Sequence, residues 1–173
     1  MSMLYCVCLF PQRDVQERAN SYRKRYDPHY AQIPPHIKVT EPFSMADDAL
    51  MSVVADLTDV AKNSEPFTLH FHKFGTFHPT HNVLYFAIKE EPALLELRRR
   101  LYERLPLGEP KHPFIPHLTI GQDLPNEELL DVYGRLRMTN LDLISPIDRF
   151  HLLYRLDDGV WTVYQTFLFG KEC

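Results

Sequence analysis

The sequence predicts a mixed α/β (α+β) fold, built as one domain with two similar lobes. Three observations lead to this prediction. Strand-like patterns alternate with patterns typical of amphipathic helices, two short strands begin with Pro-His (PHIKVT at 35–40 and PHLTIG at 116–121), and the elements around them follow the same order. The two histidines lie 81 positions apart, and the neighbouring elements repeat at about the same offset. We interpret this repeat as an internal duplication, which constrains the choice of fold.

The first half of the chain is predicted to run strand, helix, histidine strand, helix, strand. The apolar run LYCVCLF at 4–10 is a buried strand that Pro11 ends. The next segment carries apolar residues at helical spacing as far as Asp27-Pro28, namely Val15, Ala19, Tyr22 and Tyr26. The other elements of this half are a strand at 36–40, a helix capped by Ser44, and a strand at 67–74 with alternating side chains.

The second half repeats this order. Its elements are a strand at 82–88, a helix opened by Pro92, the strand in PHLTIG, a helix capped by Asn126, and a hairpin of 149–156 and 161–169 around Asp157-Asp158-Gly159. No flexible linker separates the halves. We therefore predict a single domain over residues 1–173, with lobes of roughly 1–76 and 77–173 whose termini are free to cross over.

A duplicated chain predicts two lobes around a pseudo-twofold axis, with His36 and His117 meeting across a groove. Side chains two positions apart share one face of a strand. His117 therefore points with Thr119, and His36 points with Lys38 and Thr40. Two facing imidazoles can act as acid and base near neutral pH. Hydroxyl and ammonium donors beside them can hold the non-reacting oxygens of a phosphoryl group. This constellation suits cleavage or formation of a phosphodiester without a metal or cofactor.

A structural interpretation of these histidines stands beside the catalytic one. A single histidine in an apolar strand is more often a hydrogen-bonded structural residue. Two such strands at equivalent positions of a duplicated chain, each preceded by proline, favour function instead.

Composition limits the class of partner and the compartment. The net charge of −4 excludes a surface that is basic overall, so a phosphate-binding region must be a local patch. No stretch is long and apolar enough for a membrane span, and the N-terminus lacks the pattern of a signal peptide. Cys6, Cys8 and Cys173 do not form a disulfide framework. We predict a reduced, cytoplasmic protein with no membrane association, and no feature indicates an obligate protein partner.

The stretch SYRKRYDP at 21–28 is the most basic part of the chain. Arg23 can grip a phosphate while Tyr22 and Tyr26 stack on bases, which makes these three residues candidates for substrate binding. The alternative is a solvated helix face with two core tyrosines, and the sequence does not decide between them.

His70 and His72 share one strand face, which raises the possibility of a metal site. A site needs more ligands than two, and the sequence has no H-E-x-x-H motif or paired-cysteine spacing. We therefore favour a polar strand face and predict no metal.

The strand PHLTIG, with His117 and Thr119, resembles the H-x-[T/S]-x signature of the two-histidine (2H) phosphoesterase superfamily, which includes LigT-like RNA ligases and cyclic phosphodiesterases. Further stretches resemble its bacterial YjcG-type branch: SYRKRYDP at 21–28, IPPH at 33–36, FHPTHNVLYF at 77–86, FIPHLTIGQ at 114–122 and DRFHLLYRL at 148–156. The resemblance covers nearly the whole chain. It implies a bilobal LigT-like fold with two antiparallel sheets lining a central groove and helices outside.

The same resemblance implies metal-independent hydrolysis, or reversible formation, of nucleotide or short RNA phosphodiesters such as 2′,3′-cyclic or 2′-5′ linkages. By family convention His36 is the proton donor and His117 the proton acceptor. The two sites are pseudo-symmetric, and the roles exchange when the reaction reverses.

The first motif departs from the family pattern, because Lys38 stands where threonine or serine is expected. Lysine reaches a phosphate oxygen as a point charge, and its ammonium disfavours protonation of His36. Thr40 is the candidate replacement for the missing hydroxyl. Lys38 then suits a more highly charged substrate, exchanges the acid and base roles, or leaves a nucleotide-binding protein with little catalysis. A protein-interaction module with two structural histidines is a third hypothesis.

Overall fold

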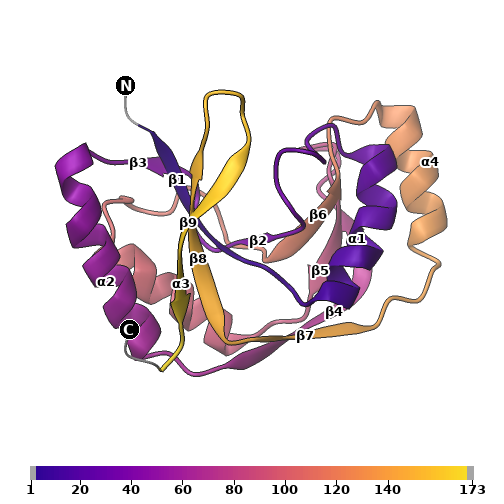
Figure 1. The fold of residues 1–173 in the computed structure, drawn as a ribbon. Helices are drawn as coiled ribbons and strands as arrows, with labels where there is room; N and C mark the ends of the chain where they lie inside the picture. The colour runs from indigo at the N-terminus through magenta and orange to yellow at the C-terminus, as the bar shows by residue number, and fades with distance from the viewer. Residues whose placement is uncertain (1–2, 171–173) are drawn as a thin grey trace.

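The computed structural model describes residues 3–170 and consists of two antiparallel β-sheets with helices on their outer sides (Figure 1). One sheet has the order β2 (Ile37–Lys38), β1 (Leu4–Leu9), β8 (Arg149–Arg155) and β9 (Trp161–Leu168), with β3 (Phe43–Ser44) also paired to β1. The other has the order β6 (His117–Gly121), β5 (Leu84–Ile88), β4 (Phe67–Thr76) and β7 (Leu143–Ile147). The predicted fold class is confirmed.

The helices exchange sides between the two halves of the chain. In Figure 1, α2 (Leu50–Lys62) and α3 (Pro92–Arg104) lie beside the first sheet, and α1 (Arg13–Tyr26) and α4 (Asn126–Leu136) lie beside the second. Thus α1 follows β1 in sequence but packs against β6, and α3 follows β5 but packs beside α2. Each half of the chain therefore contributes a helix that packs beside elements of the other half.

The strands cross over as well, so the sheets do not divide at the predicted boundary after residue 76. β4 comes from the first half of the chain but pairs with β5 and β7 of the second. The hairpin of β8 and β9 comes from the second half but pairs with β1. Each sheet therefore combines strands from both halves, and in each the histidine strand lies at the edge beside the first strand of its own half.

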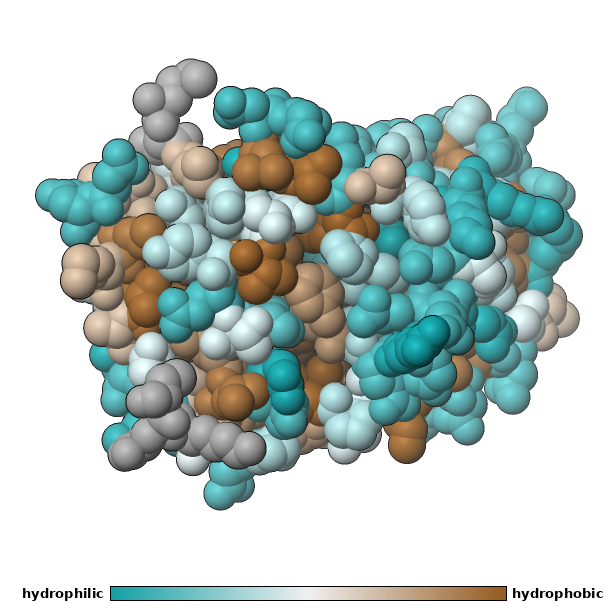
Figure 2. Space-filling model, in the orientation of Figure 1, coloured by the Kyte–Doolittle hydropathy of each residue, from teal (hydrophilic) through white to brown (hydrophobic). Residues whose placement is uncertain are grey.

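Apolar side chains from both sheets and all four helices form one large core cluster, in which Leu9, Phe71, Phe86 and Phe150 are fully buried. On the face shown in Figure 2, hydrophilic residues dominate over α1 and α4, and hydrophobic residues gather toward the half that contains β8 and β9. Within residues 3–170, no helix has the length and apolarity needed to cross a membrane.

Two predicted helix starts differ from the structure. Ser44 is not a cap but belongs to β3, where it pairs with Leu4, and α2 begins at Leu50 after a short 3₁₀ segment, η1 (Asp47–Ala49). Asn126 is the first residue of α4, and its side-chain oxygen accepts a hydrogen bond from Asn82 Nδ2. In both cases contacts with a segment distant in sequence, the strand pairing of Ser44 and the side-chain hydrogen bond of Asn126, decide the structure in place of the local capping pattern.

Candidate active site

Matching hydrogen bonds hold the two motif histidines. His36 directly precedes β2 and His117 is the first residue of β6. Each ring donates from Nδ1 to the backbone carbonyl two residues earlier, His36 to Pro34 at 2.9 Å and His117 to Ile115 at 2.6 Å. Since a carbonyl can only accept, these bonds place the proton on Nδ1 and leave Nε2 to accept or donate a proton.

A cleft of about 340 Å³ lies between the two sheets. His36 and Lys38 line it from the first motif and Thr119 lines it from the second, while His117 lies just outside this lining, two residues before Thr119 on β6. Strands β2 and β6 contact each other. The structure therefore brings residues of both motifs to one cavity, although they are far apart in the sequence.

Burial and charge make both imidazoles harder to protonate. The pKa of His36 is lowered to about 4, chiefly by burial and also by the positive charge of Lys38, while the hydrogen bond to Pro34 acts in the opposite direction. Proximity to His117 also lowers the pKa of His36. Burial likewise lowers the pKa of His117, where the hydrogen bond to Ile115 and the negative charge of Glu41 oppose burial and Lys38. Lys38 therefore acts on both rings, and His117 acts on His36, as expected for charged groups near one cavity.

Lys38 is partly exposed and pairs with Glu41, with 3.6 Å between Nζ and Oε2. Its charge acts on both motif histidines. An anion between the rings would therefore meet this ammonium, as expected for a phosphate-binding residue in place of the family hydroxyl.

Thr40 does not join the site, and the prediction that it shares a face with His36 is wrong. Its side chain is buried, and its Oγ1 accepts a hydrogen bond from the backbone N–H of Val7 at 3.1 Å. The backbone N–H groups of Val39 and Thr40 both donate to the carbonyl of Val7. This shared acceptor is typical of a β-bulge, which breaks the alternation of faces after Lys38 and turns Thr40 inward.

The basic stretch at 21–28 divides between the cleft and the core. Arg23 lines the cleft, and its buried guanidinium donates to Asn20 Oδ1 at 2.7 Å and to the carbonyl of Ile33 at 2.5 Å. Tyr22 instead packs edge-on against two core phenylalanines, Phe74 and Phe86. Tyr26 also packs against the core. The two tyrosines therefore follow the alternative interpretation, as core residues.

Aromatic side chains surround the second motif. The ring of His117 lies 4.9 Å from that of Phe77, in an edge-to-face arrangement, and 5.2 Å from that of Tyr85. At the other end of the strand, a Cβ added to Gly121 would lie 2.8 Å from Cβ of Tyr26. Glycine at this position therefore allows α1 to pack closely against β6.

Several residues of the cleft were missed by the sequence analysis. Arg155 and Trp161 come from the two sides of the β8–β9 turn, and Gln32 and Gln122 from loops. Trp161 packs beside the apolar cluster of Cys6, Cys8 and Leu153. Gln122 directly follows PHLTIG, so its place in the sequence could have indicated that it lies at the site. Arg155 and Trp161 have no such signal, because only the pairing of β8 with β1 brings them to the site.

Cys6 and Cys8 are buried and free, with 3.6 Å between their sulfur atoms, and both line the cleft. Cys173 lies outside the described residues. The His70 ring forms a hydrogen bond with Asp142 at 2.5 Å. Within residues 3–170, no group of three or more His, Cys, Asp or Glu side chains has the geometry of a metal site.

Comparison with known proteins identifies the family. The family model described as the 2′-5′ RNA ligase superfamily matches residues 11–159. This chain belongs to that superfamily. Its curated relatives include a protein of Bacillus mycoides (strain KBAB4) named "Putative phosphoesterase", 49% identical over 166 residues that cover 96% of each chain. A Geobacillus relative with the same description is 46% identical over 170 residues, 98% of each chain. The member described here is thus an enzyme of the phosphoesterase class.

Solved structures of low identity share the fold. The Escherichia coli LigT structure in complex with 3′-AMP matches with a TM-score of 0.75 and 14% identity over 99% of this chain and 100% of LigT. A Thermus thermophilus protein matches with a TM-score of 0.73 and 19% identity over the whole of both chains. These likenesses confirm the LigT-like fold that the sequence resemblance implied.

Proposed function

We propose that this superfamily member hydrolyses, or reversibly forms, nucleotide or RNA phosphodiesters such as 2′,3′-cyclic or 2′-5′ linkages, by acid and base catalysis at His36 and His117. One observation carries the proposal: two edge strands hold imidazoles with the same Nδ1 hydrogen bond, beside one cleft lined by Lys38 and Thr119. The LigT structures with 3′-AMP, ATP and NADP⁺ support a nucleotide-type substrate.

In the proposed reaction, one Nε2 removes a proton from the attacking water or hydroxyl, and the other gives a proton to the leaving oxygen. The Lys38 ammonium and the Thr119 hydroxyl hold the non-bridging oxygens of the phosphoryl group as its charge develops. Every proton transfer in this scheme uses a side chain of the protein, so the reaction needs no metal or cofactor.

The family convention makes His36 the donor, but the electrostatics of the free protein favour the exchanged roles. With its pKa at about 4, His36 is neutral at pH 7 and ready to accept a proton. His117 lies near Glu41, whose negative charge favours the protonated ring. Lys38 lowers the pKa of both rings and therefore does not distinguish them, and an anionic substrate would raise both values.

Hydrolysis of 2′,3′-cyclic nucleotides in the presence and absence of EDTA tests the proposal. We expect the same turnover in both, and a bell-shaped dependence of rate on pH. Loss of turnover on chelation would show that a metal carries the reaction and would overturn the two-histidine mechanism.

A second candidate function follows from the low pKa values. If neither ring carries a second proton, on Nε2, when substrate is bound, no general acid is present and the protein binds nucleotides with little turnover. Calorimetric binding of a cyclic nucleotide without hydrolysis over pH 5–8 would favour this function.

The free thiols of Cys6 and Cys8 support our further proposal that the protein works in the reducing cytoplasm.

A further inference from the structure

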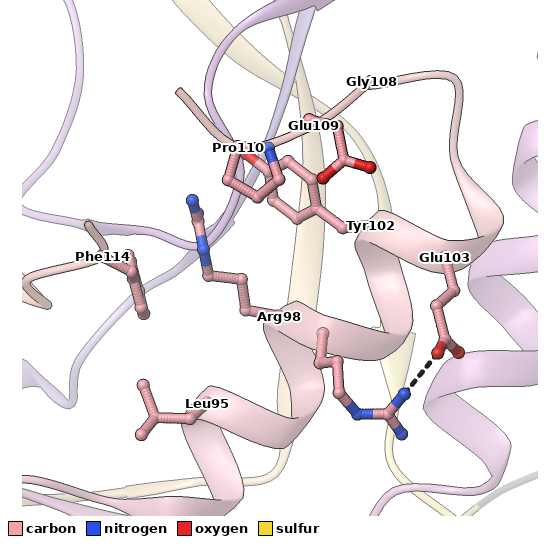
Figure 3. Close-up of a pocket in the computed structure, with 9 residues that line it drawn as sticks. Leu95, Arg98, Tyr102, Glu103, Gly108, Glu109, Pro110 and Phe114 are labelled. Carbon is pink, nitrogen blue, oxygen red and sulfur yellow. Dashed lines mark hydrogen bonds and ion pairs between the residues drawn. The ribbon is translucent and has the colours of Figure 1, made fainter. Parts of the chain in front are cut away.

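A second pocket, of about 550 Å³, adjoins the segment 38–42, because two of its lining residues hydrogen-bond to the backbone of that segment. The first and last residues of the segment, Lys38 and Pro42, line the catalytic cleft. Helix α3 and the loop that leads from it to β6 form this pocket, and its lining includes Leu95, Arg98, Tyr102, Pro110 and Phe114 (Figure 3). Its volume is in the range of small-molecule sites. None of these lining residues belongs to the catalytic cleft.

Arg98 is at the centre of this pocket. Its guanidinium carbon lies 4.4 Å from the ring centre of Tyr102 and 4.2 Å from that of Phe114, so the two rings enclose the side chain (Figure 3). Nη1 of Arg98 donates to the carbonyl of Val39 at 2.6 Å. The rings of Tyr102 and Phe114, with apolar Leu95 and Pro110 nearby, offer stacking surface to a planar heteroaromatic group, and the cation between them offers hydrogen-bond donors.

Two short segments connect this pocket to the catalytic pair. Phe114 lies three residues before His117, and the carbonyl of Ile115 between them accepts the Nδ1 hydrogen bond of His117. On the other side, the hydroxyl of Tyr102 accepts a hydrogen bond from the backbone N–H of Glu41, which pairs with Lys38. The pocket and the cleft therefore both adjoin the segments that carry the catalytic pair and Lys38.

The charge of the pocket favours a base over a second phosphate. Two arginines and two glutamates line the pocket, so the lining carries no net charge, and Arg99 pairs with Glu103 (Figure 3). Glu109 lies beside Tyr102 (Figure 3). A lining without excess positive charge suits a neutral base better than a doubly charged phosphate. A nucleobase is neutral and carries amino groups that donate to carboxylates, so it fits both the rings and the acidic groups.

We infer that the pocket of Arg98, Tyr102 and Phe114 binds the second nucleoside of a diester whose phosphorus lies between His36 and His117. This inference rests on the proposed function and makes it more specific. The preferred substrate then has a nucleoside on each side of the phosphate, one in each cavity, and is a dinucleotide or longer RNA end.

Binding of two esters tests the inference without depending on turnover. The ligands are adenylyl-(2′→5′)-adenosine and the methyl ester of adenosine 2′-monophosphate, which lacks the second nucleoside. Calorimetry uses the full chain carrying His36→Ala, so that neither ester is consumed. We expect the dinucleotide to bind about tenfold more tightly, as typical for one stacked base. Equal affinities would overturn the inference.

Variants locate the effect. Phe114→Leu on the same background removes the ring but keeps an apolar side chain, and we expect it to abolish most of the preference for the dinucleotide. Tyr164→Ala, which removes a ring that is 45% exposed on β9 and lines neither cavity, is the matched control and should keep the preference. A preference that survives Phe114→Leu, in a variant whose thermal unfolding is unchanged, would also overturn the inference.

Turnover of a 2′,3′-cyclic mononucleotide by the wild-type protein is measured in parallel, because this substrate has no second nucleoside. If it is hydrolysed while the two esters bind equally, the pocket assignment fails and the proposed function stands. If the wild-type protein hydrolyses neither this substrate nor adenylyl-(2′→5′)-adenosine, while the dinucleotide preference depends on Phe114, the proposed function fails and the pocket assignment stands.

Discussion

The two histidine segments have the same hydrogen bond at the ring but different backbones beyond it. β6 alternates between partly buried and buried side chains from His117 to Ile120, and its pairing with β5 shifts register only after Thr119. β2 contains only Ile37 and Lys38 before the bulge at Val7 turns the chain. The second segment has the family hydroxyl at Thr119. The first segment has the Lys38 ammonium at the equivalent position, and the side chain of its nearest threonine, Thr40, is buried in the core. The two segments thus share a histidine but differ in the residue two positions after it, Lys38 in the first and Thr119 in the second.

This difference teaches which features the site needs on both sides. The Nδ1 hydrogen bond to the carbonyl two residues earlier occurs twice, since it fixes the tautomer and orientation of each ring. The phosphate-binding group is less constrained, because a hydroxyl and an ammonium can both contact a non-bridging oxygen. The following predictions test this comparison, from the largest expected effect to the smallest.

Replacing either ring should have the largest effect. We expect His36→Ala and His117→Ala each to lower kcat for a 2′,3′-cyclic nucleotide by about a thousandfold, because each removes one proton-transfer group. Circular dichroism on heating should show both variants folded. Turnover close to wild type in either folded variant would mean that its ring is structural, and the symmetry of the two segments would not extend to chemistry.

Thr119→Val should lower kcat by about a hundredfold, as is typical for loss of one donor to the developing charge. The hydroxyl lies in the cleft, so the midpoint of thermal unfolding should barely change. The matched control is Thr40→Val in the other segment, which should keep its turnover. Equal losses in the two variants would argue against the assignment of Thr119 to the phosphate.

Lys38→Thr gives the first segment the family residue. We expect kcat/KM to fall by about thirtyfold through loss of a charged contact to the phosphate. Lys38 lowers the pKa of both histidines, so its removal raises both. A base must be deprotonated and an acid protonated, so both limbs of the pH profile should move to higher pH. A rise in turnover at all pH values would instead show that Lys38 lowers the catalytic rate of the natural protein.

Thr40→Val should have the smallest effect, and on stability alone. The variant keeps the shape of the side chain but leaves the buried N–H of Val7 without its acceptor. We expect a loss of about 1 kcal/mol in the free energy of unfolding, measured by urea denaturation. An unchanged stability together with reduced turnover would indicate that Thr40 acts in the active site. The two segments would then both have a threonine hydroxyl at the site.

Much of the site was predictable because the necessary signals are local. Period-two alternation places His117 with Thr119, and the repeat at an offset of 81 matches His117 to His36. The residues that the sequence assigned wrongly, such as Thr40, or left undecided, such as Tyr22, have partners that are distant in the sequence. The bulge that turns Thr40 inward depends on Val7, and the packing of Tyr22 depends on Phe74 and Phe86, partners that lie more than 30 residues away in the sequence.

The sequence by itself determined the order of the elements, the two histidine strands, the lysine substitution and the family, because these depend on side-chain type and spacing along one chain. The tertiary structure alone decided how the halves exchange strands and helices, which residues line the cleft, and that a second pocket lies beside it. These features depend on pairing between distant strands, such as β8 with β1 and β4 with β5, and no periodicity within one segment records the identity of its partner.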